Sequence, residues 1–274
     1  MGWNNELAYL WTKMVGPSRP TVSELTVYLE YVHRLMEKKK RRLRMLVLGS
    51  TPEFRDWSFE ENMEVWVMDA NLDYHNTINR EIRHKCIIEN EKYKETVICG
   101  FWQDMDFIDM FDIIIGDLAI GNIPPHRLED FLSRVKTALR EDGLFLGKSF
   151  FVPRDYNGVD FEELMANYYN GAPYNPYSLL SFHLTMCCLD ENNMLDFKKQ
   201  YDFLQGLHEK GIVKKETLAY FENVGWDNAM KFKFYCPNVW EYEALVNKYF
   251  SIVAVEYGKD IYSPYFPLYI ITKT

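Results

Sequence analysis

The chain has 274 residues, of which 47% are hydrophobic and 16% aromatic, enough to bury a sizeable core in one elaborated domain or two closely packed lobes. Its 31 basic and 40 acidic residues give a formal net charge of −9, which disfavours broad binding to nucleic acid or membrane lipid and leaves small molecules or proteins as partners. The five cysteines form no CxxC pair, and no segment approaches the roughly 18 apolar residues of a membrane span. We therefore expect a cytoplasmic protein with reduced thiols and no metal site.

Residues 1–42 predict a helical extension before the first strand. Apolar residues have helical spacing over residues 3–15 and again over 23–35. Between these segments, Arg19 precedes Pro20, which keeps the backbone extended. The basic run at 38–42 could bind nucleic acid, but cations at the carboxyl end of a helix are more typical of a solvated end stabilised by the helix dipole.

A short apolar run at residues 45–48 ends in Gly49 and is followed by Ser50, Thr51 and Pro52. This pattern is typical of a buried strand that passes through a turn into a helix, since Pro52 suits a first helical turn. In a parallel sheet, such a turn offers free backbone N–H groups to an anionic or polar ligand. The same residues also fit a buried strand with no binding role, so the neighbouring strands must decide.

Two further apolar runs end in an acidic residue. Residues 64–69 end in Asp69, 20 residues after Gly49, where a carboxylate can accept hydrogen bonds from both hydroxyls of a ribose. Asp69 could instead only cap the helix predicted over 72–85. Residues 111–117 end in Asp117.

Strands and helices alternate through this region. A run at 96–102 leads into Gln103 and Asp104, and a helix predicted over 124–140 precedes a fifth strand at 144–150. Five strands that alternate with helices predict an α/β fold with a parallel sheet covered on both faces.

From about residue 43 to about residue 151 the chain resembles the class I S-adenosylmethionine-dependent methyltransferases. Residues 48–53 resemble the glycine loop under the methionine part of the cofactor, in a GxTPE version that keeps only Gly49 of the common GxGxG pattern. Residues 102–104 resemble the adenine-edge segment, and Asp117 the residue beside the transferred methyl. The resemblance implies that S-adenosyl-L-methionine is bound by Gly49, Ser50, Thr51, Pro52, Asp69, Trp102, Gln103, Asp104 and Asp117.

The resemblance also implies a Rossmann-like, doubly wound, mostly parallel seven-stranded sheet whose last strand runs antiparallel between the fifth and sixth. A helix over 237–250 and strands over 251–257 and 267–272 fit this ending. The segment 153–236 is too rich in aromatics for a loose loop and predicts a helical lid that recognises substrate. The expected organisation is therefore a helical extension (1–42), a cofactor-binding core (43–152), the lid insertion (153–236) and the end of the core sheet (237–274).

Methyl transfer needs positioning and, for a hydroxyl or a protonated amine, a base. Asp117, His126 and Asp155 are candidate bases, because each follows the carboxyl end of strand four or five. Asp117 could instead only position the cofactor, His126 could face solvent, and Asp155 could be an ordinary turn residue. Arg19 could grip the cofactor's carboxylate or an acidic acceptor, or be structural. Aromatic side chains of the lid could grip the acceptor, or only pack the lid itself: Tyr168, Tyr169, Tyr174, Tyr177 and His183.

The stretch at 122–125 is similar to the Asn-Pro-Pro signature of enzymes that methylate exocyclic amines of bases, but Ile123 interrupts it and we give it no role. We predict an enzyme that transfers a methyl group to a small-molecule acceptor, with oxygen favoured over nitrogen. Two alternatives stay open: a methyltransferase that acts on a protein, peptide or RNA, and a non-catalytic binding protein on the same scaffold. A Rossmann dehydrogenase fits less well, because the turn after residue 48 lacks the glycines that admit a pyrophosphate.

Overall fold

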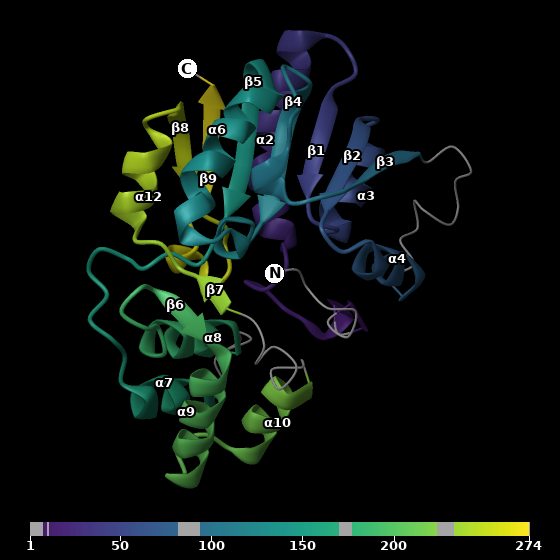
Figure 1. Cartoon of the computed structure of the whole chain (residues 1–274). Coiled ribbons are helices and arrows are strands. Elements are labelled where there is room, and N and C mark those ends of the chain that lie inside the picture. Colours follow the sequence, from purple (N-terminus) through teal and green to yellow (C-terminus); the bar gives the residue numbers. More distant parts are fainter. Residues whose placement is uncertain (1–7, 10, 82–93, 170–176, 224–232, 274) are drawn as a thin grey trace.

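A seven-stranded sheet with the order β3-β2-β1-β4-β5-β9-β8 forms the centre of the molecule (Figure 1). The computed structural model describes residues 8–9, 11–81, 94–169, 177–223 and 233–273. Strands β1 to β5 run parallel, and β9 pairs antiparallel with both β5 and β8, which confirms the predicted mostly parallel sheet and its ending. The strands are β1 (Arg44–Leu48), β2 (Glu64–Asp69), β3 (Glu95–Cys99), β4 (Phe111–Asp117), β5 (Leu139–Lys148), β8 (Phe250–Glu256) and β9 (Leu268–Lys273).

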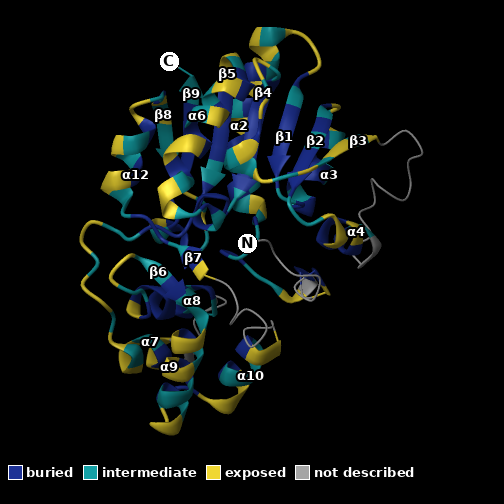
Figure 2. Ribbon diagram, in the orientation of Figure 1, coloured by how far each residue is buried: buried dark blue, intermediate teal, exposed yellow. Residues whose placement is uncertain are grey.

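Helices cover both faces of the sheet, because successive side chains of each strand point to opposite faces. On one face, α2 (Val22–Lys39) and α3 (Pro52–Glu60) pack over Val47 and Ile115. On the other, α6 (Leu128–Ala138) and α12 (Val239–Val246) pack over Leu46 and Ile114. A further helix, α4 (Leu72–Glu81), follows β2. Figure 2 shows the central strands buried between these layers, which explains their continuous apolar sequences.

The insertion after β5 is largely helical, as predicted, and lies beyond the carboxyl ends of the strands (Figure 1). Its two ends are adjacent, because Val152 and Asn238 form a parallel bridge. It shares an apolar cluster with the core, in which Leu118 and Phe150 meet Phe234. Its elements are α7 (Phe161–Tyr169), α8 (Tyr177–Cys187), β6 (Met194–Asp196), α9 (Phe197–Glu209), α10 (Lys215–Asn223) and β7 (Lys233–Tyr235).

Several element boundaries differ from the sequence predictions. The helix predicted over 124–140 begins with a separate 3₁₀ turn, η4 (Pro125–Arg127), and ends at Ala138, because Leu139 already pairs with Phe111 as part of β5. The helix predicted over 237–250 covers only Val239–Val246. The basic run at 38–42 ends α2, where Lys38 Nζ lies 2.9 Å from the Asp142 carboxylate.

The amino-terminal segment does not form the helix predicted over 3–15 in its described part. Residues 8–9 are helical, and the next described element is the 3₁₀ turn η1 (Trp11–Lys13). Contacts with distant elements hold the segment instead: Trp11 Nε1 donates to Glu53 of α3 at 3.2 Å, and Ser178 of α8 donates to the Gly16 carbonyl. Helical periodicity alone could not reveal these contacts.

Apolar packing and strand pairing hold the described parts of the chain together. The cysteines that the structure describes are free thiols: Cys99, Cys187, Cys188 and Cys236. Within the described ranges, no helix has the length and apolarity needed to cross a membrane. Within the same ranges, no three His, Cys, Asp or Glu side chains cluster closely enough to hold a metal ion.

Candidate functional site

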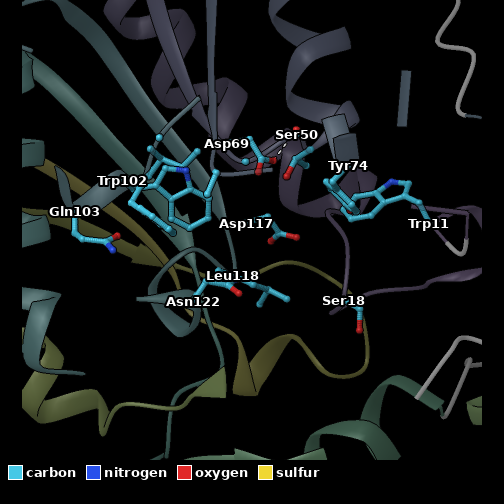
Figure 3. Close-up of a pocket in the computed structure, with 16 residues that line it drawn as sticks. Trp11, Ser18, Ser50, Asp69, Tyr74, Trp102, Gln103, Asp117, Leu118 and Asn122 are labelled. Atoms are coloured by element: carbon cyan, nitrogen blue, oxygen red, sulfur yellow. Dashed lines mark hydrogen bonds between the residues drawn. The ribbon is translucent and has the colours of Figure 1, made fainter. Parts of the chain in front are cut away.

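A first cavity of about 750 Å³, part of it open to solvent, lies at the carboxyl ends of β1, β2 and β4. This is where open parallel sheets bind ligands, because strand ends and helix N-termini meet there. Figure 3 shows Asp69 and Ser50 side by side, with Trp102 and Trp11 on opposite sides of the cavity and Asp117 between them.

The turn after β1 forms one wall. Gly49 has a φ of +88°, in the left-handed region that favours glycine, and its N–H donates to the backbone of β2 at 2.9 Å. A Cβ at Gly49 would already lie 3.4 Å from the Trp102 ring. Ser50 and Thr51 line the cavity, whereas Pro52 begins α3 behind it. Thr51 makes no side-chain cap, so the first backbone N–H groups of α3 are available to a ligand.

Asp69 is buried at the end of β2, and both oxygens of its carboxylate are held in place. Oδ2 accepts a hydrogen bond from the Ser50 hydroxyl at 2.7 Å, and Oδ1 accepts one from the Asn71 N–H at 2.8 Å. Burial raises the pKa of Asp69, while these two hydrogen bonds oppose the rise. A carboxylate has about four acceptor positions, so Asp69 can still accept hydrogen bonds from two ligand hydroxyls.

A chain of buried polar groups supports Asp69 from behind. Ser50 Oγ lies 3.0 Å from His75 Nδ1, and His75 Nε2 lies 3.2 Å from Glu95 Oε1. Glu95 also accepts two hydrogen bonds from the buried Arg55 guanidinium, at 2.5 and 2.8 Å. This network fixes the Ser50 hydroxyl and thereby orients the Asp69 carboxylate.

The segment after β3 contributes a flat wall. Trp102 begins the 3₁₀ turn η2 (Trp102–Asp104), and its Nε1 donates to the Met68 carbonyl at 2.7 Å. Gln103 lines the cavity as well. Asp104 does not, because it is exposed and lies 2.7 Å from the Arg127 guanidinium. Two of the three predicted adenine-edge residues therefore lie at the cavity.

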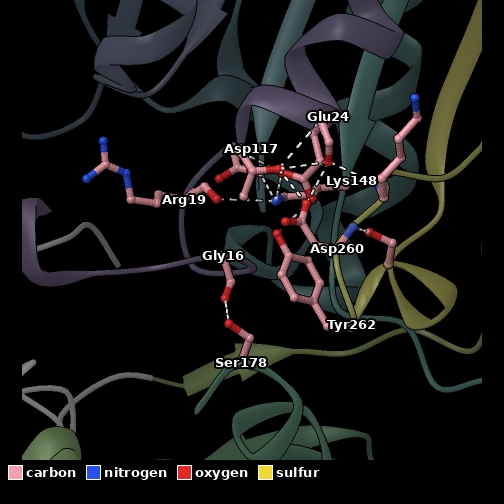
Figure 4. A network of polar contacts seen from close by, with 12 residues as sticks. Gly16, Arg19, Glu24, Asp117, Lys148, Ser178, Asp260 and Tyr262 are labelled. Atoms are coloured by element: carbon pink, nitrogen blue, oxygen red, sulfur yellow. Dashed lines mark hydrogen bonds and ion pairs between the residues drawn. The ribbon is translucent and has the colours of Figure 1, made fainter. Parts of the chain in front are cut away.

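Asp117 ends β4 and belongs to a buried charged cluster (Figure 4). Lys148 Nζ lies 2.6 Å from Glu24 Oε2 and 3.4 Å from Asp117 Oδ1. Burial raises the pKa of Asp117 to about 7, although the nearby ammonium of Lys148 lowers it. Burial alone would lower the pKa of Lys148, but the two carboxylates raise it above its ordinary value. Lys148 thus stays charged, and Asp117 can exchange a proton near neutral pH.

A second cavity of about 960 Å³, also partly open, lies between the sheet and the insertion. It shares Ser18, Leu118 and Asn122 with the first cavity, and we call these three residues the junction. Asn122 ends the turn η3 (Ile120–Asn122), and its Nδ2 donates to the Leu118 carbonyl at 3.0 Å. The two cavities therefore lie next to each other.

His126, Asp155 and Arg19 also line neither cavity. His126 in η4 and Asp155 in the loop after β5 are exposed, because the chain turns toward solvent once it leaves the strand ends. Arg19 donates to the Trp11 carbonyl at 3.1 Å and pairs with Glu53. The hydrogen bonds that we expected Arg19 to give to a carboxylate of the cofactor are thus made within the protein.

The predicted acceptor-binding aromatics are placed differently from one another. Tyr177 lines the second cavity. His183 does not line it: this side chain is buried, its Nδ1 lies 3.1 Å from the Tyr156 hydroxyl, and burial lowers its pKa to about 4. Tyr174 and the side chains of Tyr168 and Tyr169 lie outside the part of the chain that the structure describes.

Some residues of the site carry little or no signal in the sequence. Trp11, Ser18 and Tyr74 line the first cavity, and no motif marks them. Ser18 reaches the junction only because the amino-terminal segment crosses the strand ends. Asn122 carries a weak signal, its place in the 122–125 stretch to which we gave no role.

No family model matches the chain, and no curated protein matches it by sequence. Solved structures match it at low identity. A Rhodobacter sphaeroides protein assigned provisionally to the zinc-dependent alcohol dehydrogenases has a TM-score of 0.55 at 13% identity, over 99% of each chain. The PH0226 protein of Pyrococcus horikoshii OT3 has a TM-score of 0.50 at 16% identity, over 90% of this chain and 91% of that one.

A third similar structure is the magnesium protoporphyrin IX methyltransferase ChlM of Synechocystis PCC 6803, solved with bound S-adenosylhomocysteine. Its TM-score is 0.51 at 9% identity, over 92% of this chain and 83% of that one. Similarity at this identity shows the fold. The chain therefore has the fold of the class I S-adenosylmethionine-dependent methyltransferases.

Proposed function

We propose that the protein is an S-adenosylmethionine-dependent methyltransferase that acts on a small molecule held in the second cavity. The observation that carries the proposal is the junction, where the two cavities meet beside Asp117. A fold alone does not establish chemistry, but two adjoining cavities offer separate places for a methyl donor and an acceptor. The free thiols fit a cytoplasmic setting.

The first cavity fits the three parts of this cofactor. Asp69 can accept hydrogen bonds from two ribose hydroxyls, and the Trp102 ring offers a flat surface to a base. The amino terminus of α3, which follows Thr51 at the cavity wall, favours the negative charge of a carboxylate. Asp117 also lines this cavity, where its carboxylate, paired with the Lys148 ammonium at 3.4 Å, can accept a hydrogen bond from a ligand.

The bound cofactor would supply a methyl group on an activated sulfonium. The residues of this chain then need to hold the acceptor atom in line, roughly 3 Å away, and to exclude water. Leu118 and Asn122 lie where the two molecules meet, and residues 14–18 cover this side. When a hydroxyl is methylated, its proton needs an acceptor, and Asp117 can hold one near neutral pH.

The shape of the second cavity favours a small acceptor. Its walls come from the amino-terminal segment, the sheet ends and the insertion, so it encloses a bounded space and not an extended groove. A protein, peptide or RNA acceptor would need a wider groove. A non-catalytic binding protein would use the first cavity and leave the junction without a chemical role.

Calorimetric titration with S-adenosylhomocysteine tests the proposal, with NAD⁺ as the comparison ligand. We expect S-adenosylhomocysteine to bind in the micromolar range and to raise the melting temperature, whereas NAD⁺ does neither. Stabilisation by NAD⁺ and not by S-adenosylhomocysteine would overturn the assignment. Tight S-adenosylhomocysteine binding with no turnover across a broad acceptor screen would favour the non-catalytic alternative.

A further inference from the structure

We propose that the acceptor is an uncharged, planar aromatic compound whose N–H or O–H group donates a hydrogen bond to Gln200, at a distance from the junction. This inference rests on the proposed function, because it names the acceptor class of the same site. Gln200 lies on α9, lines the second cavity and is fully buried. Its Oε1 has no hydrogen-bond partner among the described residues.

Neighbouring groups fix the orientation of the Gln200 amide. The Thr185 hydroxyl donates to the Ser181 carbonyl at 2.8 Å, which uses its proton. Gln200 Nε2 lies 2.9 Å from the same hydroxyl oxygen and donates to it. If the amide were reversed, Gln200 Oε1 would face the Thr185 hydroxyl oxygen with no proton between the two acceptors. Oε1 is therefore the amide atom that is left without a partner. A buried amide oxygen in this state is unfavourable, and a ligand N–H or O–H removes the penalty.

Aromatic rings form much of the remaining wall. Tyr177 and Tyr220 stack with ring centroids 3.8 Å apart and planes 8° from parallel. Phe150 and Phe234 meet edge to face with centroids 5.7 Å apart. All four residues line the cavity, and Lys233 is the single charged residue among its described lining. Flat, rigid rings favour a flat apolar ligand, and Lys233 disfavours a cationic one.

The position of Gln200 separates recognition from reaction. Gln200 lines the second cavity but is not one of the residues at the junction. The ligand atom that donates a hydrogen bond to Gln200 is therefore not the atom that receives the methyl group. An acceptor of this class carries two polar atoms on one flat scaffold, one toward the junction and one toward α9.

Two matched pairs of compounds test this inference: indole with 1-methylindole, and 2-naphthol with 2-methoxynaphthalene. Within each pair the second member lacks the donor hydrogen. Binding is measured calorimetrically to protein saturated with S-adenosylhomocysteine. We expect the donor-bearing member to bind roughly tenfold more tightly to the wild type, and this preference to fall to about twofold or less in Gln200→Leu. Gln205→Leu, on the same helix but outside the cavity lining, should keep the tenfold preference.

Thr185→Val provides a second variant that leaves Gln200 in place. Without the Thr185 oxygen the Gln200 amide can reverse, so the preference for the donor-bearing compound of each pair should also shrink. This variant keeps the inference testable if Gln200→Leu does not fold. S-adenosylhomocysteine affinity is measured in the wild type and in every variant. A wild type that does not bind S-adenosylhomocysteine would contradict the proposed function, and not the inferred acceptor class. Equal binding within each pair to the wild type, an unchanged preference in the variants, or no binding of any of the four compounds would overturn the inference.

Discussion

The two cavities are assembled from the chain in different ways. The first takes most of its walls from the carboxyl ends of β1 to β4, whose relative positions follow from the strand order, and the rest from Trp11, Ser18 and Tyr74. The second takes its walls from residues 14–18, the connections after β4 and β5, and five elements of the insertion. The cofactor side of the site is thus built from local strand-turn-helix units, whereas the acceptor side exists only after distant segments have packed together.

The two cavities also differ in their chemistry. The first has two buried acids, Asp69 and Asp117, each tied into a polar network. The second is walled by aromatic rings, with one charged residue in its described lining and the uncharged amide of Gln200. Substitutions that affect one cavity and spare the other therefore test whether the two sides are separable.

Lys148→Met should have the largest effect, because it leaves the buried Glu24 carboxylate beneath the first cavity without its cation. We expect a loss of about 3–5 kcal/mol in the free energy of unfolding, measured with urea at pH 7. Lys38→Met is the control, since the Lys38–Asp142 pair at 2.9 Å is exposed and should contribute at most about 1 kcal/mol. Equal losses in both variants would contradict the buried character of the Lys148 cluster.

The parts of the structure that the sequence predicts are those governed by short-range rules. Buried parallel strands are continuous apolar runs, so the strands that end at Leu48, Asp69 and Asp117 are recognised from the sequence. A glycine after a strand and an acid at the end of the next one mark Gly49 and Asp69, and both line the first cavity.

The remainder depends on contacts between distant residues. Glu24 and Lys148 are 124 positions apart, and the capping-box position of Glu24 at the start of α2 does not predict a contact with Lys148. In the sequence, Gln200 looks like any polar residue on an amphipathic helix. Only the packing of α9 against distant segments buries it fully. For Asp155 and His126 the sequence predicted too much. Their positions after a strand predicted a role as catalytic base, but their side chains face solvent.

Asp69→Ala tests the cofactor side. Loss of a charged acceptor for ribose hydroxyls should weaken S-adenosylhomocysteine binding by about 1.5–3 kcal/mol. Calorimetry measures this change, and binding of indole in the second cavity should stay the same. Asp73→Ala, in the exposed first turn of α4, is the control. Unchanged affinity in a folded Asp69→Ala protein would remove Asp69 from the site.

Gly121→Ala tests the acceptor side. A Cβ at Gly121 would lie 1.9 Å from Cζ of Phe234, a buried ring that lines the second cavity. We expect a stability loss of about 1–3 kcal/mol and weaker indole binding, with S-adenosylhomocysteine affinity changed less than about twofold. Gly206→Ala in α9 meets no atom within 4 Å and should instead stabilise the protein by up to about 1 kcal/mol. Equal weakening of both ligands would show that the two sides are not separable.

The smallest expected effect is the pH dependence that Asp117 gives to the stability of the cofactor side. The pKa of Asp117 is raised to about 7 in the folded protein from an ordinary value of 3.8. Between these values the folded state keeps a proton that the unfolded state releases, so stability falls as pH rises through this window. Asp117→Asn has no such proton.

Urea unfolding at pH 5.5 and 6.5 measures this contribution. From pH 5.5 to pH 6.5, the free energy of unfolding of the wild type should fall by about 1 kcal/mol more than that of Asp117→Asn. His183, whose pKa burial lowers to about 4, changes stability in the opposite direction, because its unfolded form binds the extra proton. His183 is present in both proteins, so its contribution cancels in the difference. Gln200→Leu removes no titratable group and should keep the wild-type pH dependence. Identical pH dependence in the wild type and Asp117→Asn would mean that Asp117 is already ionised at pH 5.5 and cannot take up a proton near neutral pH.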